Sequence, residues 1–246
     1  MIITMYPPDT LYQISIHSTL SQLLDQGENF VLTTVYKGIP LTQKISRMEI
    51  ESDYVQFKPP HQICGVVPGQ NIYIHHEKLP RCVVSSVEDI DMVAGVIRTS
   101  NLRYVDHPWQ VRTNERVQPK HPLRTIFSIA HWSVSACVAD ISVNGIGLLV
   151  FGMKHKGLNI EVGVPIQLGL RLPETNSPQL IKGTIVRINP LGNSSMVSLG
   201  IQTFPTERQS HHLKNYITSR QTEILEELAL IVRQSMEPAQ TKDLFF

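Results

Sequence analysis

The chain has 246 residues and a formal net charge of +1. This length suits two small domains better than one. Hydrophobic residues make up 41% of the sequence, and charged residues make up 17%, against about 25% in average soluble proteins. These values disfavour a disordered chain and argue against a binder of nucleic acid polymers, which carries a basic excess over a whole face. Any site for an anion must therefore be local.

The sequence also lacks the usual signals for secretion or membrane insertion. No basic region precedes the first apolar residues, and the longest apolar run is far too short to span a bilayer. Cys64, Cys82 and Cys137 are scattered and form no CxxC pair, which fits a reducing compartment and buried thiols. We therefore expect a cytoplasmic protein with no membrane span.

The first half of the chain is predicted to be a short helix followed by strands. The helix covers residues 18–26, where Ser18 can cap its start and Gly27 can end it in the left-handed conformation. Short apolar runs separated by Gly and Pro signals then predict strands at 29–36, 39–47, 53–57, 71–75, 81–86 and 92–98, with Lys37-Gly38 as the first turn. Strands at this spacing favour a small barrel.

A polar segment with a proline, residues 99–111, is the best candidate for a linker between domains. Beyond it, apolar and polar residues alternate over 160–172, with a turn or bulge expected at Gly163 and Pro165. Further alternation at 180–188 and 197–204 completes the pattern of a second barrel.

The chain is predicted to end in a helix. Thr206 and Gln209 form a possible capping box, and apolar residues recur at helical spacing to about Met236. The fold class is therefore mainly β, with two small β-barrel domains, the first of split-barrel type, and a C-terminal α-helix. We place the domains at 1–106 and 107–222, with a helical extension and tail at 223–246.

Two short motifs carry the chemistry of the second half. The first is Arg112-Thr-Asn-Glu-Arg116, directly after the linker, and the second is Asp140-Ile-Ser142-Val-Asn-Gly145, at the end of a strand. Together they have the form RxxxR…DxSxxG. This pair resembles the signature of the PilZ family of cyclic di-GMP receptors, and the resemblance covers about residues 110–220. More loosely, the N-terminal half resembles the YcgR-type domain that precedes PilZ in flagellar-brake proteins.

The resemblance implies that cyclic di-GMP is bound as a ligand, with no cofactor. Arg112 and Arg116 should hold phosphate and a base edge, while Asp140, Ser142 and Gly145 should hold the other guanine. The physical chemistry agrees, because a guanidinium can bond phosphate or the O6/N7 edge of guanine in a bidentate manner. A carboxylate is the complementary acceptor for the N1–H and N2–H donors of guanine. We expect the arginine segment to be exposed and flexible before it folds over the ligand.

The alternative interpretation is that these arginines are solvated loop charges and that Asp140 to Gly145 is merely a turn, since Asp, Ser and Gly are common turn residues. Val111 departs from the family pattern, because many relatives carry a further Arg there; one or two bound ligand molecules therefore both remain open. The sequence contains no set of three or four residues at metal-ligand spacing and no catalytic motif, so we predict no enzyme and no metal site. Trp132 is predicted to lie in the core, whereas Trp109 in the linker could be buried or could stack on a base.

Two functions remain. The first is a ligand-gated adaptor that binds cyclic di-GMP at the junction of its domains, changes their arrangement and regulates a protein partner. By analogy alone that partner would be the flagellar motor, with the protein at the flagellar basal body and a role in motility or biofilm formation. The second is a PilZ-fold interaction module that does not bind nucleotide. The distal part of the C-terminal helix either packs on its own barrel or forms a homodimer.

Overall fold

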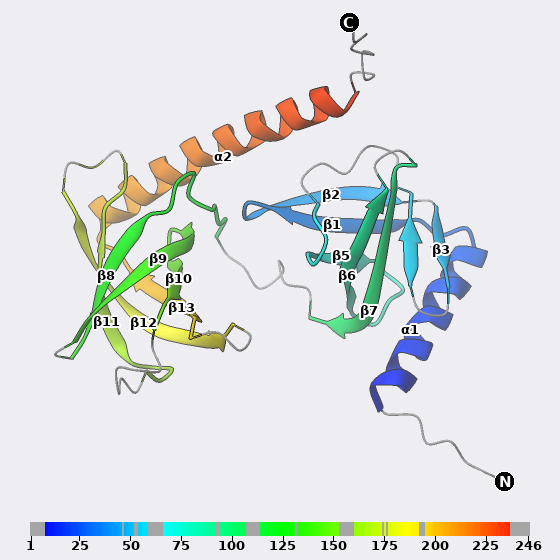
Figure 1. Ribbon diagram of the computed structural model, residues 1–246, viewed down its shortest axis with the longest axis horizontal. Coiled ribbons are helices and arrows are strands. Elements are labelled where there is room, and N and C mark those ends of the chain that lie inside the picture. Colours follow the sequence, from blue (N-terminus) through cyan, green and yellow to red (C-terminus); the bar gives the residue numbers. More distant parts are fainter. Residues whose placement is uncertain are drawn as a thin grey trace, which may run out of the picture. The chain divides into compact units, whose positions relative to one another are not determined.

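The computed structural model describes residues 8–45, 47–51, 54–58, 66–91, 94–106, 114–130, 132–152, 160–173, 175, 177–191 and 195–236. These residues form two compact units, each with its own sheet. The first holds the N-terminal helix and seven strands, and the second holds six strands and the first part of the C-terminal helix (Figure 1). The mainly β fold class predicted from the sequence is confirmed.

The first unit begins with helix α1 (Pro8–Asp25), which packs against a curled sheet. The strands follow the order β2-β1-β5-β6-β7-β4-β3. The pairs β1–β5, β5–β6, β6–β7, β7–β4 and β4–β3 are antiparallel. Their bounds are β1 (Phe30–Tyr36), β2 (Ile39–Ile45), β3 (Met48–Ile50), β4 (Val55–Phe57), β5 (Asn71–His75), β6 (Cys82–Asp91) and β7 (Val96–Val105). β1 and β2 meet at Lys37 and Gly38, both of positive φ, as a two-residue hairpin requires.

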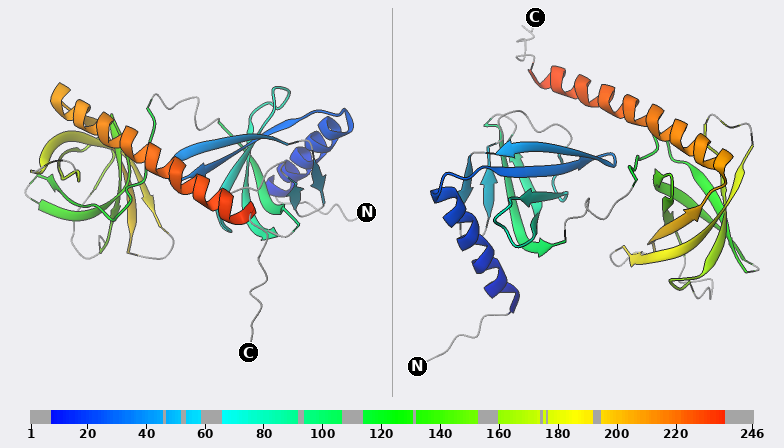
Figure 2. Two further views of the ribbon diagram at one scale, coloured as in Figure 1. Left: turned by 90° about the horizontal axis from the view of Figure 1, so that it is seen from above. Right: turned by 180° about the vertical axis from the view of Figure 1, so that it is seen from behind.

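The core of the first unit lies between α1 and the concave face of its sheet. α1 contacts β7 and β3, and Figure 2 shows the helix against this sheet. Ile16 and Leu20 of the helix are fully buried together with Phe30 and Phe57 of the strands. Burial of four such side chains contributes about 1.5–3 kcal/mol each, so this contact fixes the helix on the sheet.

Two predictions for this unit are wrong in their boundaries. α1 begins at Pro8, well before Ser18, because proline has a suitable φ and no amide hydrogen to satisfy in the first turn. Its end is as predicted, since Gly27 has φ 76° and its N–H bonds the carbonyl of Leu24 at 2.8 Å. The proposed linker is too long at its start, because β7 continues to Val105 in register with β6. Residues 99–105 form a strand despite their polar composition, because they pair with β6.

The second unit is a closed barrel of six antiparallel strands in the order β10-β13-β12-β11-β8-β9 (Figure 1). The strands are β8 (Arg124–Ile129), β9 (Trp132–Ser142), β10 (Gly145–Val150), β11 (Pro165–Leu170), β12 (Gln179–Pro190) and β13 (Val197–Phe204). Alternate residues point inward, so Phe127, Leu148, Leu168 and Leu199 are fully buried. Gly163, with φ 91°, lies in the turn before β11, as predicted.

Helix α2 (Glu207–Met236) follows β13 directly. The predicted capping box is present: the Gln209 side chain accepts from the Thr206 N–H at 2.9 Å, and the Thr206 hydroxyl accepts from the Gln209 N–H. Leu213, Tyr216 and Ile217 of the helix are buried. In the described part of the chain, no helix is long and apolar enough to cross a bilayer.

Two single-residue expectations have different outcomes. Cys82 is buried, which raises the pKa of its thiol to about 11, whereas Cys137 is half-buried and Cys64 lies outside the described residues. Trp132 is 54% exposed, so its assignment to the core is wrong. It is in phase with buried Val134, but it is the first residue of β9, at the end of the strand beside the turn.

The tight packing of the barrel gives a prediction for stability. A Cβ at Gly183 would lie 2.8 Å from the Gln202 carbonyl oxygen and from a methyl group of Ile201, so Gly183→Ala forces backbone or core to move. We expect a loss of about 1–3 kcal/mol in the free energy of unfolding, measured with urea. Gly169→Ala is the matched control, because its Cβ meets only ordinary contacts of 3.4 Å and above. Equal stability of the two variants would contradict this account.

Candidate functional site

Arg116 and Asp140 form an ion pair beside the barrel. Nη1 of Arg116 donates to Oδ1 of Asp140 at 3.2 Å, and the two side chains are 33% and 26% exposed. The structure therefore brings the second arginine of RxxxR together with the first residue of DxSxxG. A guanidinium has five N–H donors and a carboxylate has two oxygens, so this single bond leaves most of the hydrogen-bonding capacity of both groups available.

The backbone next to Arg116 is fixed to the strand that carries Asp140. Val117 and Ile141 exchange two hydrogen bonds of 2.9 Å, and both side chains are fully buried. Because Arg116 precedes Val117 and Asp140 precedes Ile141, this bridge sets the separation of the two charged side chains. The ion pair therefore follows from main-chain pairing and core packing rather than from charge alone.

Helix α2 holds the same segment from another side. Arg220 is 3% exposed, and its Nε donates to the Gln118 carbonyl at 3.0 Å while its Nη1 donates to Glu223 at 2.9 Å. The Gln221 amide donates to the carboxylate of Glu115. A buried guanidinium that lost these acceptors would be costly, so Arg220 is a strong link between the helix and the arginine segment.

For residues 115–118, this anchoring corrects the expectation of an exposed and flexible arginine segment. Residues Glu115, Arg116, Val117 and Gln118 each make a contact to β9 or α2, as described above. Arg112 lies outside the described residues, so its predicted place is not tested by the structure. Trp109 also lies outside them.

Ser142 and Gly145 flank the turn between β9 and β10. The Ser142 hydroxyl donates to the Gly145 carbonyl at 2.9 Å, and Ser142 is buried. A Cβ at Gly145 would lie 3.2 Å from that hydroxyl oxygen, which is tight. In this structure the two residues shape the turn beside Asp140, and the serine oxygen retains its capacity to accept hydrogen bonds.

Gly147 is a residue that the motif-based prediction missed. It is paired with Asp140 across β9 and β10, where the register shifts by a bulge. A Cβ on Gly147 would lie 2.5 Å from Oδ2 of Asp140, closer than real Cβ atoms approach. The absence of a side chain at Gly147 therefore makes the space that the carboxylate occupies. The Gly145-Ile-Gly147 pattern was the available signal, since a glycine inside a strand often marks a close approach.

Among the residues that the structure describes, no group of three His, Cys, Asp or Glu side chains could hold a metal ion. The arrangement at Arg116 and Asp140 is instead suited to recognition, because it presents a cation for phosphate and an acceptor for N–H donors side by side.

A family model named PilZ domain matches residues 110–219. This part of the chain is a PilZ domain. The match includes both motifs, the whole barrel and the first part of α2. A comparison with curated proteins found no match.

Solved structures similar to the chain are distant in sequence. The inhibitor of motility MotI/DgrA from Bacillus subtilis is 16% identical with a TM-score of 0.40, over 80% of this chain and 97% of that protein. YcgR from Escherichia coli, in complex with c-di-GMP, is 15% identical with a TM-score of 0.43, over 89% and 94%. MrkH from K. pneumonia, in its c-di-GMP complex, is 11% identical with a TM-score of 0.42, over 87% and 96%.

The exposure of the ion pair gives a prediction about its strength. Because Arg116 and Asp140 are partly exposed, solvent screens their attraction, and we expect a coupling energy of about 1 kcal/mol or less. The measurement is a double-mutant cycle with Arg116→Gln and Asp140→Asn, followed by urea unfolding. The same cycle on the longer Lys120–Glu223 pair, at 3.8 Å, serves as a reference. A coupling of about 3 kcal/mol or more would show that the pair is a structural element instead.

Proposed function

We propose that this chain is a receptor for cyclic di-GMP, which it binds through Arg112, Arg116, Asp140, Ser142 and Gly145. The observation that carries the proposal is the ion pair of Arg116 and Asp140 in the PilZ domain, beside the turn from Ser142 to Gly145. The ligand has two phosphates and two guanines, so it needs cations and N–H acceptors in one place. The two motifs supply both.

In this proposal, Arg116 and Asp140 hold each other in position through their ion pair before the ligand binds. Asp140 neutralises Arg116 through one oxygen, and its second oxygen stays available for the N1–H or N2–H of guanine. Arg116 keeps donors for a phosphate oxygen or for the O6/N7 edge of the base. Since the two groups already lie in place, little side-chain entropy is lost at this half of the site when the ligand binds.

Arg112 would complete the site from the other end of its motif. A dianionic ligand gains about 1.5–3 kcal/mol from each hydrogen bond to a charged group, so a second arginine adds substantially to affinity.

The first experiment is a calorimetric titration with cyclic di-GMP. Arg112→Ala and Arg116→Ala should each weaken binding by roughly tenfold to a hundredfold or more, because each removes charge-assisted bonds to the ligand. Arg124→Ala is the matched control, since Arg124 is an exposed cation at the start of β8, outside both motifs. Cyclic di-AMP should bind much more weakly than cyclic di-GMP, because adenine lacks the N1–H and N2–H donors.

The competing function is a PilZ-fold interaction module that binds no nucleotide. An absence of heat and of saturable binding with cyclic di-GMP would favour it. Wild-type affinity in either arginine variant, at unchanged melting temperature, would instead remove that residue from the site.

We further propose that the receptor acts as an adaptor for a protein partner. An exposed apolar surface on the barrel supports this role: Ile126 is 56% exposed, Leu180 is 64% exposed and Phe204 is 56% exposed. Ile126 and Leu180 lie in one row across Gly169, and Phe204 pairs with Lys182 in the next row. Large apolar side chains clustered on an outer wall are typical of an interaction surface.

The identity of the partner is a proposal by analogy alone. We propose a component of the flagellar motor, so that the protein regulates motility or biofilm formation from the cytoplasm at the flagellar basal body. The distal part of α2 supports homodimer formation as a further element, because Leu225 and Leu230 are more than half exposed there. Light scattering of wild type and Leu225→Glu would distinguish a dimer from a monomer.

The regulatory step that we propose is a change in domain arrangement. In the sequence, the division between the two compact units falls after Arg112, inside the RxxxR motif. A ligand that holds Arg112 and Asp140 together would restrict the chain at that division, and it would favour the arrangement that it binds best. Small-angle scattering should show a narrower distribution of distances with saturating cyclic di-GMP, and Asp140→Ala should abolish the change. An unchanged distribution in the saturated wild type would contradict this mechanism.

A further inference from the structure

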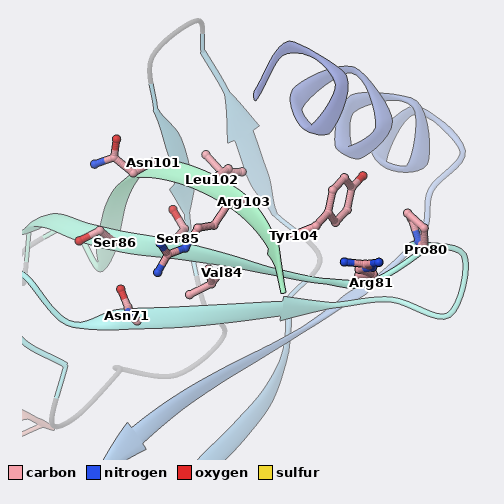
Figure 3. A pocket seen from close by; sticks show the side chains of 10 residues that line it. All are labelled: Asn71, Pro80, Arg81, Val84, Ser85, Ser86, Asn101, Leu102, Arg103 and Tyr104. Atoms are coloured by element: carbon pink, nitrogen blue, oxygen red, sulfur yellow. The ribbon is translucent and has the colours of Figure 1, made fainter. Parts of the chain in front are cut away.

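A hollow lies within the first unit, and the described residues that line it precede both motifs in the sequence. It has a volume of about 950 Å³ and is lined by residues of β5, β6 and β7 and of the turn before β6 (Figure 3). Sites for small organic ligands typically have volumes of about 300–1,000 Å³, and the volume of this hollow lies near the upper end of that range. Figure 3 shows Pro80, Arg81 and Tyr104 toward one end of the hollow and Asn71, Ser86 and Asn101 toward the other.

The hollow lies where β7 extends beyond its pairing with β4. β4 pairs with β7 only from Ile97 to Thr99, whereas β7 continues alongside β6 to Val105. Among the described strands, none pairs with the far side of β7 beyond Thr99. Residues 101–104 therefore lie on an edge of the sheet where no described strand pairs with β7.

A bulge shapes the same edge. Val84 pairs with Arg103 and Ser86 pairs with Ser100, so β7 has one more residue than β6 over this interval. Asn101, in the bulge, has φ 56°, and the Ser85 hydroxyl donates to the Ser100 carbonyl at 2.7 Å. Bulges redirect side chains, and unusual backbone conformations held by surrounding structure are concentrated at binding sites.

The charged side chains that line the hollow are all positive. Arg81 and Arg103 both line it, and none of the ten described residues that line it is acidic. Within the described ranges, neither guanidinium forms an ion pair or a hydrogen bond. In a chain with a net charge of +1, two unneutralised arginines in one hollow are a local excess.

We infer that this hollow binds a small organic anion that carries phosphate or carboxylate groups. Arg81 and Arg103 would bind the charged oxygens, since a guanidinium matches the geometry of both groups. Asn71, Ser86 and Asn101 supply neutral hydrogen-bonding groups, and Pro80 and Tyr104 supply apolar contact. None of the described lining residues belongs to the proposed cyclic di-GMP motifs, and the inference does not depend on that proposal.

The test uses the full chain with Arg112→Ala and Arg116→Ala, so that the PilZ motif does not bind the probes. Pyrophosphate and citrate are titrated by calorimetry at about 0.15 M salt, where long-range attraction between exposed charges is screened. We expect saturable binding of one molecule per chain. Binding of pyrophosphate alone assigns a phosphate ligand, and binding of citrate alone assigns a carboxylate ligand.

Two variants test the arginines, and a third is the matched control. Arg81→Gln and Arg103→Gln should each weaken binding by roughly tenfold or more, because each removes charge-assisted bonds. Arg98→Gln changes the net charge equally on the same strand, but its guanidinium lies over the Tyr54 ring at 4.9 Å and does not line the hollow. The control should bind like the parent.

Arg103→Lys should recover part of the affinity, since it restores the charge without the planar donor group. Circular dichroism checks that each variant is folded. The inference is overturned if neither probe binds saturably, or if the two glutamine variants and the control bind alike. Because the PilZ motif is disabled throughout, these outcomes are independent of whether the protein binds cyclic di-GMP.

Discussion

The two hydrogen bonds between Val117 and Ile141 determine the geometry of the candidate site. They join a segment without regular secondary structure to the end of a barrel strand, and buried side chains on both residues hold the bridge in place. Arg116 and Asp140 are brought together as a consequence. The core thus positions a partly exposed ion pair that would be too weak to position itself.

Helix α2 extends this constraint away from the barrel. Its buried Arg220 bonds the Gln118 carbonyl, two residues after Arg116. A displacement of the arginine segment would therefore strain its hydrogen bond to the helix, and a displacement of the helix would strain the same bond. This gives a direct physical route by which a ligand at the PilZ motif could influence whatever contacts α2.

The sequence predicts those features that depend on local chemistry. The Thr206–Gln209 cap, the Lys37-Gly38 turn and the glycine end of α1 are correct because each depends on a few neighbouring residues. Features that depend on pairing between residues far apart in the sequence are harder to predict. The extension of β7 requires β6, and the exposure of Trp132 depends on where the barrel ends, neither of which periodicity can report. The motif residues of the candidate site can be named from the sequence, but the Arg116–Asp140 contact and the anchoring by Arg220 require the fold.

Gly147 shows that the residues of the motif do not by themselves ensure the geometry of the site. Its missing side chain is what gives the Asp140 carboxylate its place, yet it lies outside RxxxR and DxSxxG. A PilZ domain with alanine at this position would keep every letter of the signature while its aspartate was displaced. A survey of such domains by signature alone would not detect this displacement.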